Sequence, residues 1–75
     1  MSEIMYSKIR DACGNNKQLK DMYMVDVTEA TCDVFKRLGY NPSKNIHDSF
    51  DKAWVNSNRE DYLYEFIYKV WRNDS

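Results

Sequence analysis

The sequence predicts an all-α fold, a compact bundle of four to five short helices. Apolar residues recur at helical spacing in several stretches, and Gly14 and Gly39 stand where two of these stretches end. No Asn-Gly or Asp-Gly turn separates two alternating runs, as a β-hairpin would require. With 75 residues and no internal linker, the chain is expected to form a single helical domain over 1–75, frayed at 72–75.

The first helix is expected over 3–13. Ser2 is its predicted N-cap, and Gly14 ends the apolar pattern. Its inner face is expected to comprise Met5, Ile9, Ala12 and Cys13. A second, short helix is expected over 19–23, where apolar residues recur at i, i+3 and i+4. An extended conformation over 23–25 stays open as the alternative.

The third helix is expected to begin at Asp26 and to end at Gly39. Asp26 and Glu29 form a capping-box pattern, in which each side chain accepts from the other's backbone N–H. Glycine is the usual residue after a helix, and Tyr40 is expected to fold back on Phe35. The inner face is expected to comprise Val27, Ala30, Thr31, Val34 and Leu38.

The fourth helix is expected to begin with Asn41 as N-cap and Pro42 as its first residue, because proline has no N–H to leave unpaired there. It is expected to end before Asn56. Apolar residues at i, i+4, i+7 and i+8 predict its inner face: Ile46, Phe50, Ala53 and Trp54.

The last helix is predicted from a second capping box, formed by Ser57 and Glu60. Glu65 and Lys69 stand four residues apart in the favourable order for an ion pair on a helix. The residues at core spacing are Leu63, Phe66, Ile67 and Val70.

This last helix carries more apolar surface than a single core face needs. From Tyr62 to Trp71, eight of ten residues are apolar or aromatic. At about 100° per residue they cover roughly 240° of the helix, whereas a core-facing helix needs a stripe of a little over 100°. The surplus either enlarges a small core or contacts a partner. We expect the second, with Tyr62, Tyr64, Tyr68 and Trp71 as partner-binding residues.

The residues that could carry catalysis or bind a metal are few. His47 is the single histidine, and Cys13 and Cys32 are the two cysteines. A zinc site or a Cys-His pair is conceivable, but their separations match no compact metal motif, whose ligands come in close pairs. We expect buried, reduced thiols and a solvated histidine, with no metal and no cofactor.

Two carboxylates, Asp48 and Asp51, share a predicted helix face and could serve acid-base chemistry or a divalent cation. Lys44 and Lys52 are their neighbours four residues away, which is typical of a solvated, ion-paired helix surface. No glycine-rich phosphate loop or nucleophile motif is present in the sequence. We expect no catalytic residue.

Charge and hydropathy disfavour two classes of partner. Eleven Lys plus Arg against twelve Asp plus Glu give a formal charge of −1, with both signs along the whole chain, which argues against a nucleic-acid partner. No stretch approaches the ~18 apolar residues of a membrane span, and no secretory leader stands at the N-terminus. A cytoplasmic protein with reduced cysteines is therefore expected.

These observations predict a small non-enzymatic regulator or inhibitor that docks on a larger protein through an aromatic helix face. Its richness in Asn, Lys, Tyr, Ile, Met and Phe, which AT-rich codons encode, suggests a gene of a virus or mobile element. One alternative is a nucleic-acid-binding transcriptional regulator in which the third and fourth helices form a helix-turn-helix-like arrangement. Another is a structural homodimer whose aromatic stripe seals against its own copy.

Overall fold

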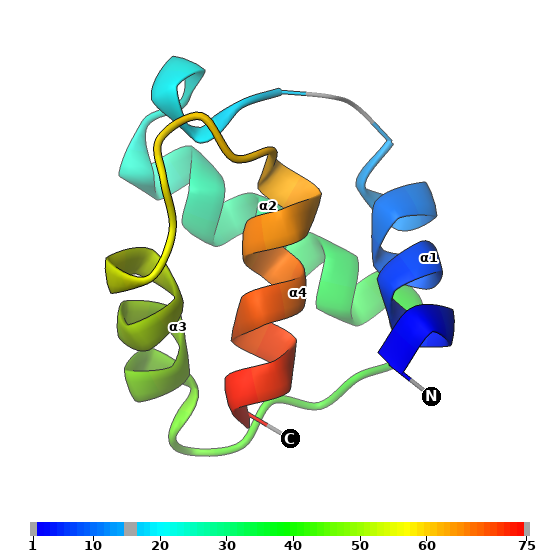
Figure 1. The fold of residues 1–75 in the computed structure, drawn as a ribbon. Coiled ribbons are helices and arrows are strands. Elements are labelled where there is room, and N and C mark those ends of the chain that lie inside the picture. Colours follow the sequence, from blue (N-terminus) through cyan, green and yellow to red (C-terminus); the bar gives the residue numbers. More distant parts are fainter. Residues whose placement is uncertain (1, 15–16, 75) are drawn as a thin grey trace.

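Helices make up the secondary structure of the described chain. The computed structural model describes residues 2–14 and 17–74 (Figure 1). In chain order the elements are α1 (Ser2–Cys13), the 3-10 turn η1 (Leu19–Asp21), α2 (Met24–Leu38), α3 (Ile46–Val55) and α4 (Leu63–Asp74). No strand occurs in these two ranges; only an isolated bridge joins Gln18 to Tyr62. The predicted all-α bundle is confirmed.

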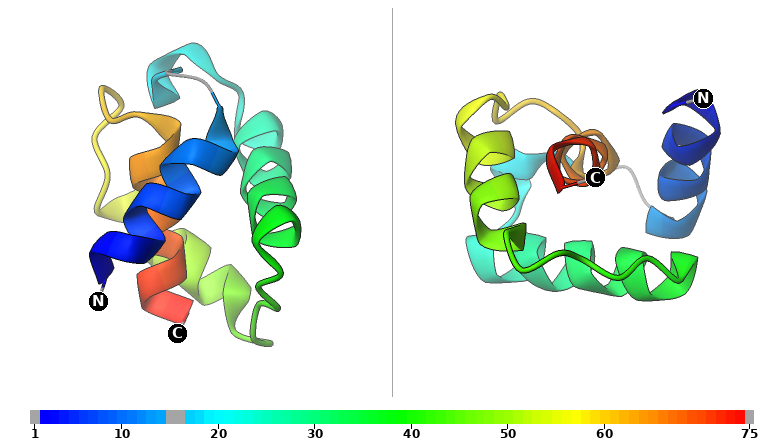
Figure 2. Two further views of the ribbon diagram at one scale, coloured as in Figure 1. Left: turned by 90° about the vertical axis from the view of Figure 1, so that its right-hand side faces the viewer. Right: turned by 90° about the horizontal axis from the view of Figure 1, so that it is seen from below.

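The last helix, α4, occupies the centre of the fold. The end-on view in Figure 2 shows α4 in the middle, with α3 on one side, α1 on the other and α2 crossing beside all three. α3 and α1 pack closely on α4, and α1 also packs on α2. The four residues predicted at core spacing are all buried: Leu63, Phe66, Ile67 and Val70. The central place of α4 explains why it contributes four buried apolar residues to the core.

The core collects apolar residues from every helix. Phe66 of α4 meets two rings of α3 edge-on, with centroids 4.9 Å from Phe50 and 5.7 Å from Trp54. α1 contributes Ile9, and α2 contributes Val27, Val34 and Phe35, all of them buried. Ile9, Val27 and Val34 lie on the predicted inner faces and confirm them at these positions, whereas Phe35 is a core residue that the predicted face did not include.

Backbone hydrogen bonds tie the connection before α2 to the connection before α4. The amides of Leu19 and Lys20 donate to the carbonyls of Asp61 and Arg59, at 2.9 and 2.8 Å. The amide of Leu63 donates to the Lys17 carbonyl at 2.9 Å. These bonds hold the start of α4 against the segment that contains η1, and they satisfy main-chain groups outside the α-helices.

The start of α2 differs from the prediction. α2 begins at Met24, so Asp26 and Glu29 lie inside the helix, and the N-cap residue, Tyr23, makes no side-chain cap. The capping box is therefore wrong here, because both side chains fall past the position where a box can form. The predicted second helix shrinks to η1, and Tyr23 has the extended backbone that was left open.

The end of α2 matches the prediction. Gly39 has φ +72° and caps the helix in the left-handed region, which glycine reaches at little cost. The Tyr40 amide then donates to the Phe35 carbonyl at 2.9 Å, and the two rings meet with centroids 5.0 Å apart. The predicted return of Tyr40 onto Phe35 is confirmed.

The start of α3 lies four residues after the predicted Pro42. α3 begins at Ile46, with Asn45 as its N-cap residue. Ser43 explains the difference, because its backbone amide and hydroxyl both donate to Asp74, at 2.9 and 2.6 Å. The Ser43 hydroxyl also accepts from the Asn45 amide at 3.1 Å. These bonds hold the chain in a turn and leave no helix over 41–43.

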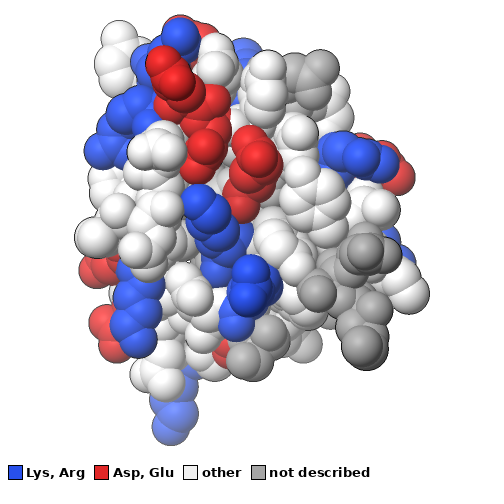
Figure 3. Space-filling model, viewed as in Figure 1, with Lys and Arg blue, Asp and Glu red and all other residues white. Residues whose placement is uncertain are grey.

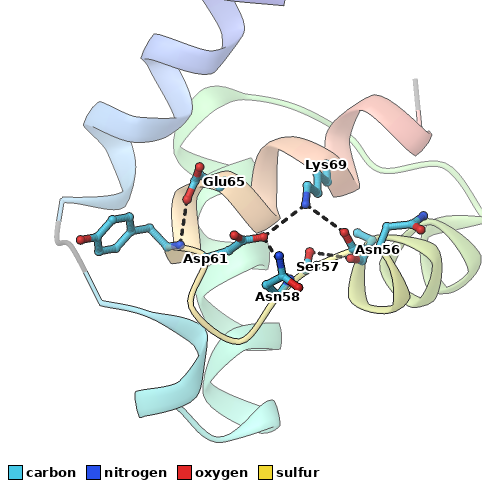
Figure 4. A network of polar contacts seen from close by, with 8 residues as sticks. Asn56, Ser57, Asn58, Asp61, Glu65 and Lys69 are labelled. Carbon is cyan, nitrogen blue, oxygen red and sulfur yellow. Dashed lines mark hydrogen bonds and ion pairs between the residues drawn. The ribbon is translucent and has the colours of Figure 1, made fainter.

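The start of α4 also differs from the prediction, as Figure 4 shows. The Ser57 hydroxyl donates to the Ala53 carbonyl at 2.6 Å and so closes α3 instead of capping α4. Glu65 accepts from the Tyr62 amide at 2.9 Å, which is half of a capping box placed five residues later than Ser57 and Glu60. Lys69 pairs with Asp61 at 3.3 Å, not with Glu65 as predicted.

The C-terminal residues are held in place as far as Asp74, which corrects the predicted frayed tail at 72–75; Ser75 lies outside the described residues. α4 continues to Asp74, whose carboxylate accepts hydrogen bonds from Tyr40 (2.7 Å), Ser43 and Ser49 (3.2 Å). We call this set the Asp74 cluster. Burial alone would raise the pKa of Asp74, but the hydrogen bonds from Ser43, Tyr40 and Ser49 outweigh it and lower the pKa. Burial, and then the bond to Asp74, raises the pKa of Tyr40 to about 12.

The Tyr40 phenol predicts a loss of stability at alkaline pH. Between pH 10 and about 12 the unfolded chain releases this proton while the folded chain keeps it, so the free energy of unfolding falls with rising pH. Below pH 10 the phenol contributes no pH dependence. We expect Tyr40→Phe to flatten this slope in urea unfolding followed by circular dichroism. An unchanged slope in the variant would contradict the prediction.

Candidate protein-binding surface

Five aromatic rings contact one another in a continuous row over α4 and α1. Tyr62 stacks on Tyr64 with centroids 5.9 Å apart and planes 6° apart. Tyr6 meets Tyr64 and Tyr68 edge-on, at 5.8 and 5.2 Å. Tyr68 in turn stacks on Trp71 at 5.9 Å. We call these five residues the aromatic surface. It contains all four residues that the sequence predicts as partner-binding.

These rings are neither enclosed nor fully exposed. Tyr6, Tyr64, Tyr68 and Trp71 are half-buried, and Tyr62 exposes 38% of its surface. α1 covers part of the stripe through Tyr6, whereas the remaining edges reach the molecular surface. The two roles weighed in the sequence, core and interface, are thus both compatible with the same rings.

Tyr6 is the member of the aromatic surface that the sequence did not indicate. It stands next to Met5, a residue of the predicted inner face of the first helix, and nothing local shows that α1 packs on α4. Burial first, and then a hydrogen bond with Tyr64, raises the pKa of the Tyr6 phenol. The edge-on contacts of the Tyr6 ring with Tyr64 and Tyr68 hold these rings in place where α1 packs on α4.

A second exposed apolar patch lies at the start of α2. Tyr23 exposes 79% of its surface, and Met24 and Val25 are also exposed. The sequence pattern placed Tyr23 with the inner residues of a short helix, but the extended backbone at this position turns its ring to the solvent. Tyr23 has no ring contact among the described residues.

The two cysteines and the histidine do not form one cluster. Cys32 and His47 both line an apolar groove of about 320 Å³ between α2 and α3, whereas Cys13 lies in the last turn of α1. Cys32 is exposed, which corrects the expectation that it is buried; Cys13 is half-buried, and neither forms a disulfide. Within residues 2–14 and 17–74 no group of three metal-ligating side chains is found.

The carboxylates Asp48 and Asp51 are exposed on α3 together with Lys52, and Lys44 is exposed in the turn before the helix. The predicted ion pairs between them are not seen. Within the described ranges, ion pairs join Lys69 to Asp61 and Arg10 to Asp11. Long, solvated side chains gain little from pairing on a helix surface, which accounts for the difference.

In the alternative hypothesis of a helix-turn-helix-like DNA-binding protein, α2 is the first helix of the motif and α3 is the second. They are joined by residues 39–45, a longer connection than the turn of about three or four residues in a helix-turn-helix. The exposed face of the second helix carries Asp48 and Asp51, which would repel phosphates. The face shown in Figure 3 carries both Lys or Arg and Asp or Glu side chains, with an acidic group above a basic one and no continuous basic face.

Comparisons of the chain with protein-family models, with curated proteins and with solved structures find no match. Within the described residues, no helix is both long enough and apolar enough to cross a membrane.

Proposed function

We propose that this chain is a small non-enzymatic binding protein that docks on a larger protein through the aromatic surface and so inhibits or redirects it. The single observation that carries the proposal is the unbroken row of five half-exposed rings from Tyr62 to Trp71, by way of Tyr6. Tyr and Trp are the residue types that dominate binding energy at protein interfaces.

Three features of the row suit an interface. The rings hold one another in place, so little rotamer freedom is lost when a partner covers them. Four of the five residues are tyrosines, whose hydroxyl groups can hydrogen-bond at the rim of a contact. Arg72 lies over the Tyr68 ring at 5.8 Å, and arginine is the third residue type enriched at interface centres.

The proposal predicts that Tyr62→Ala combined with Trp71→Ala prevents partner capture. Tyr62 is the most exposed ring of the row, and Trp71 ends it without contacting Tyr6. Immobilised full-length chain is exposed to lysate of the cells that produce it, and retained proteins are quantified by mass spectrometry. We expect the specific partner to fall about tenfold or more, as for loss of a hot spot.

The matched control is Tyr23→Ala, which removes an exposed ring outside the aromatic surface. It should retain the partner at the wild-type level, and circular dichroism should show native helix content for both variants. Equal retention by the double variant and the wild type would refute the proposal. Concentration-dependent sedimentation that the double variant abolishes would instead assign the surface to a second copy of the chain.

A further inference from the structure

A polar pocket of about 290 Å³ lies between α3 and α4. Among the described residues, its lining includes two cations and two amides and no carboxylate: Ala53, Asn56, Lys69, Arg72 and Asn73. Figure 3 shows Lys and Arg side chains gathered in the middle of this face of the molecule, below a group of acidic ones. A pocket lined in this way offers donors and positive charge to an acceptor group.

Lys69 is largely occupied by the protein itself. Its Nζ donates to the Asn56 carbonyl at 3.1 Å and to an Asp61 carboxylate oxygen at 3.3 Å, as Figure 4 shows. One of its three N–H groups remains for a ligand. The charge of Lys69 is balanced by Asp61, so this pair adds little net charge to the pocket.

Arg72 is not occupied in the same way. Among the described residues it has no hydrogen-bond acceptor and no ion-pair partner, and its guanidinium lies over the face of the Tyr68 ring. All five N–H groups of its guanidinium are available. The net charge that the pocket presents is therefore about one positive charge, carried by a planar fork that matches a carboxylate in geometry.

Two carbonyls at the C-terminal end of α3 already accept hydrogen bonds: Ser57 donates to Ala53, and Lys69 donates to the C-cap residue Asn56. The amides add donors, because Asn73 uses one N–H on the Ser49 carbonyl at 3.3 Å and keeps the other. One positive charge and several N–H donors suit a monoanion better than a phosphate with two charges.

We infer that this pocket binds one carboxylate group, the side chain of an Asp or Glu on the docking partner. The inference rests on the proposed function, because Arg72 joins the pocket to the aromatic surface through Tyr68, which stacks on Trp71. A partner lying on the rings would bring its acidic side chain to the guanidinium, where a bidentate pair forms.

The test uses acetate and a short peptide with blocked ends and one glutamate as probes. In the ¹⁵N-labelled chain, sodium acetate replaces sodium chloride at constant ionic strength. We expect saturating shifts of the Asn56 and Asn73 side-chain amides and of the Arg72 Nε–H. Arg72→Gln should weaken acetate binding about tenfold, the loss of one charge-assisted bidentate contact. Arg37→Gln, a cation on α2, is the matched control and should bind as the wild type does.

Each outcome decides between the claims. Shifts that do not saturate, or that survive Arg72→Gln unchanged, overturn the carboxylate pocket. Binding of acetate but not of the glutamate peptide, tested against the same peptide with glutamine, overturns the assignment to a protein side chain. The Tyr62→Ala and Trp71→Ala double variant should keep acetate binding. If this variant binds acetate and still captures the partner, docking through the aromatic surface is refuted, whereas carboxylate binding by the pocket is retained.

Discussion

Phe66→Ala is expected to remove most of the stability of this chain. Phe66 is fully buried on α4 and is the ring on which Phe50 and Trp54 of α3 converge. Truncation of a buried phenylalanine costs about 3–5 kcal/mol through lost transfer energy and a residual cavity. A small domain has about 0.05–0.15 kcal/mol of stability per residue, so this loss is a large part of the total.

Urea unfolding followed by circular dichroism measures the effect of Phe66→Ala. If the variant is unfolded in buffer, Phe66→Leu provides a milder change, with an expected loss of up to about 1.5 kcal/mol. The control is Val55→Ala, at a side chain that exposes 80% of its surface and should change stability by less than about 0.5 kcal/mol. Equal losses at Phe66 and Val55 would contradict a core centred on α4.

Asp74→Ala is expected to cost about 2 kcal/mol at neutral pH. Its carboxylate accepts hydrogen bonds from Tyr40, Ser43 and Ser49, and each bond to a charged group contributes about 1.5–3 kcal/mol when buried. The estimate lies well below their sum because the cluster is partly open to solvent. Removal of the carboxylate frees the turn before α3 from the end of α4.

The pH dependence of this effect has a definite sign. The pKa of Asp74 is lowered by folding, so its contribution is complete above the unfolded value of about 3.9 and is lost as the pH falls through the lower folded value. The stability difference between wild type and Asp74→Ala should therefore shrink in acid. Asp51→Ala, at an exposed aspartate on α3, is the control and should show no comparable loss at neutral pH. A difference that persists below the folded pKa would contradict the assignment.

Periodicity predicted the buried faces well, because burial follows the helical repeat. Leu63, Phe66, Ile67 and Val70 all reach the core, and Gly39 ends α2 as expected. A left-handed cap is specified by local residues, so it can be recognised in the sequence alone. The interface prediction at Tyr62, Tyr64, Tyr68 and Trp71 stays a prediction, although the structure groups these rings.

Helix starts were predicted poorly, because the serines near them bind groups outside the helix that follows. Ser43 donates to Asp74, 31 residues away, and holds a turn where Asn41 and Pro42 were predicted to start the helix. Ser57 donates back to Ala53 and closes α3 instead of capping α4. The sequence also did not indicate Tyr6 as a member of the aromatic surface, because the packing of α1 on α4 is a tertiary contact. Local patterns cannot distinguish a serine that caps the next helix from one that holds a remote carboxylate.

The main-chain hydrogen bonds that link 17–20 to 59–63 determine which substitutions these two segments tolerate. The amides of Leu19, Lys20 and Leu63 donate across the two connections, and these groups are the same in every amino acid except one. Exposed residues in these two segments, such as Lys20, can therefore be substituted while the hydrogen bonds between the segments remain. Proline at Leu19, Lys20 or Leu63 would remove one of these hydrogen bonds, because its backbone nitrogen carries no hydrogen to donate.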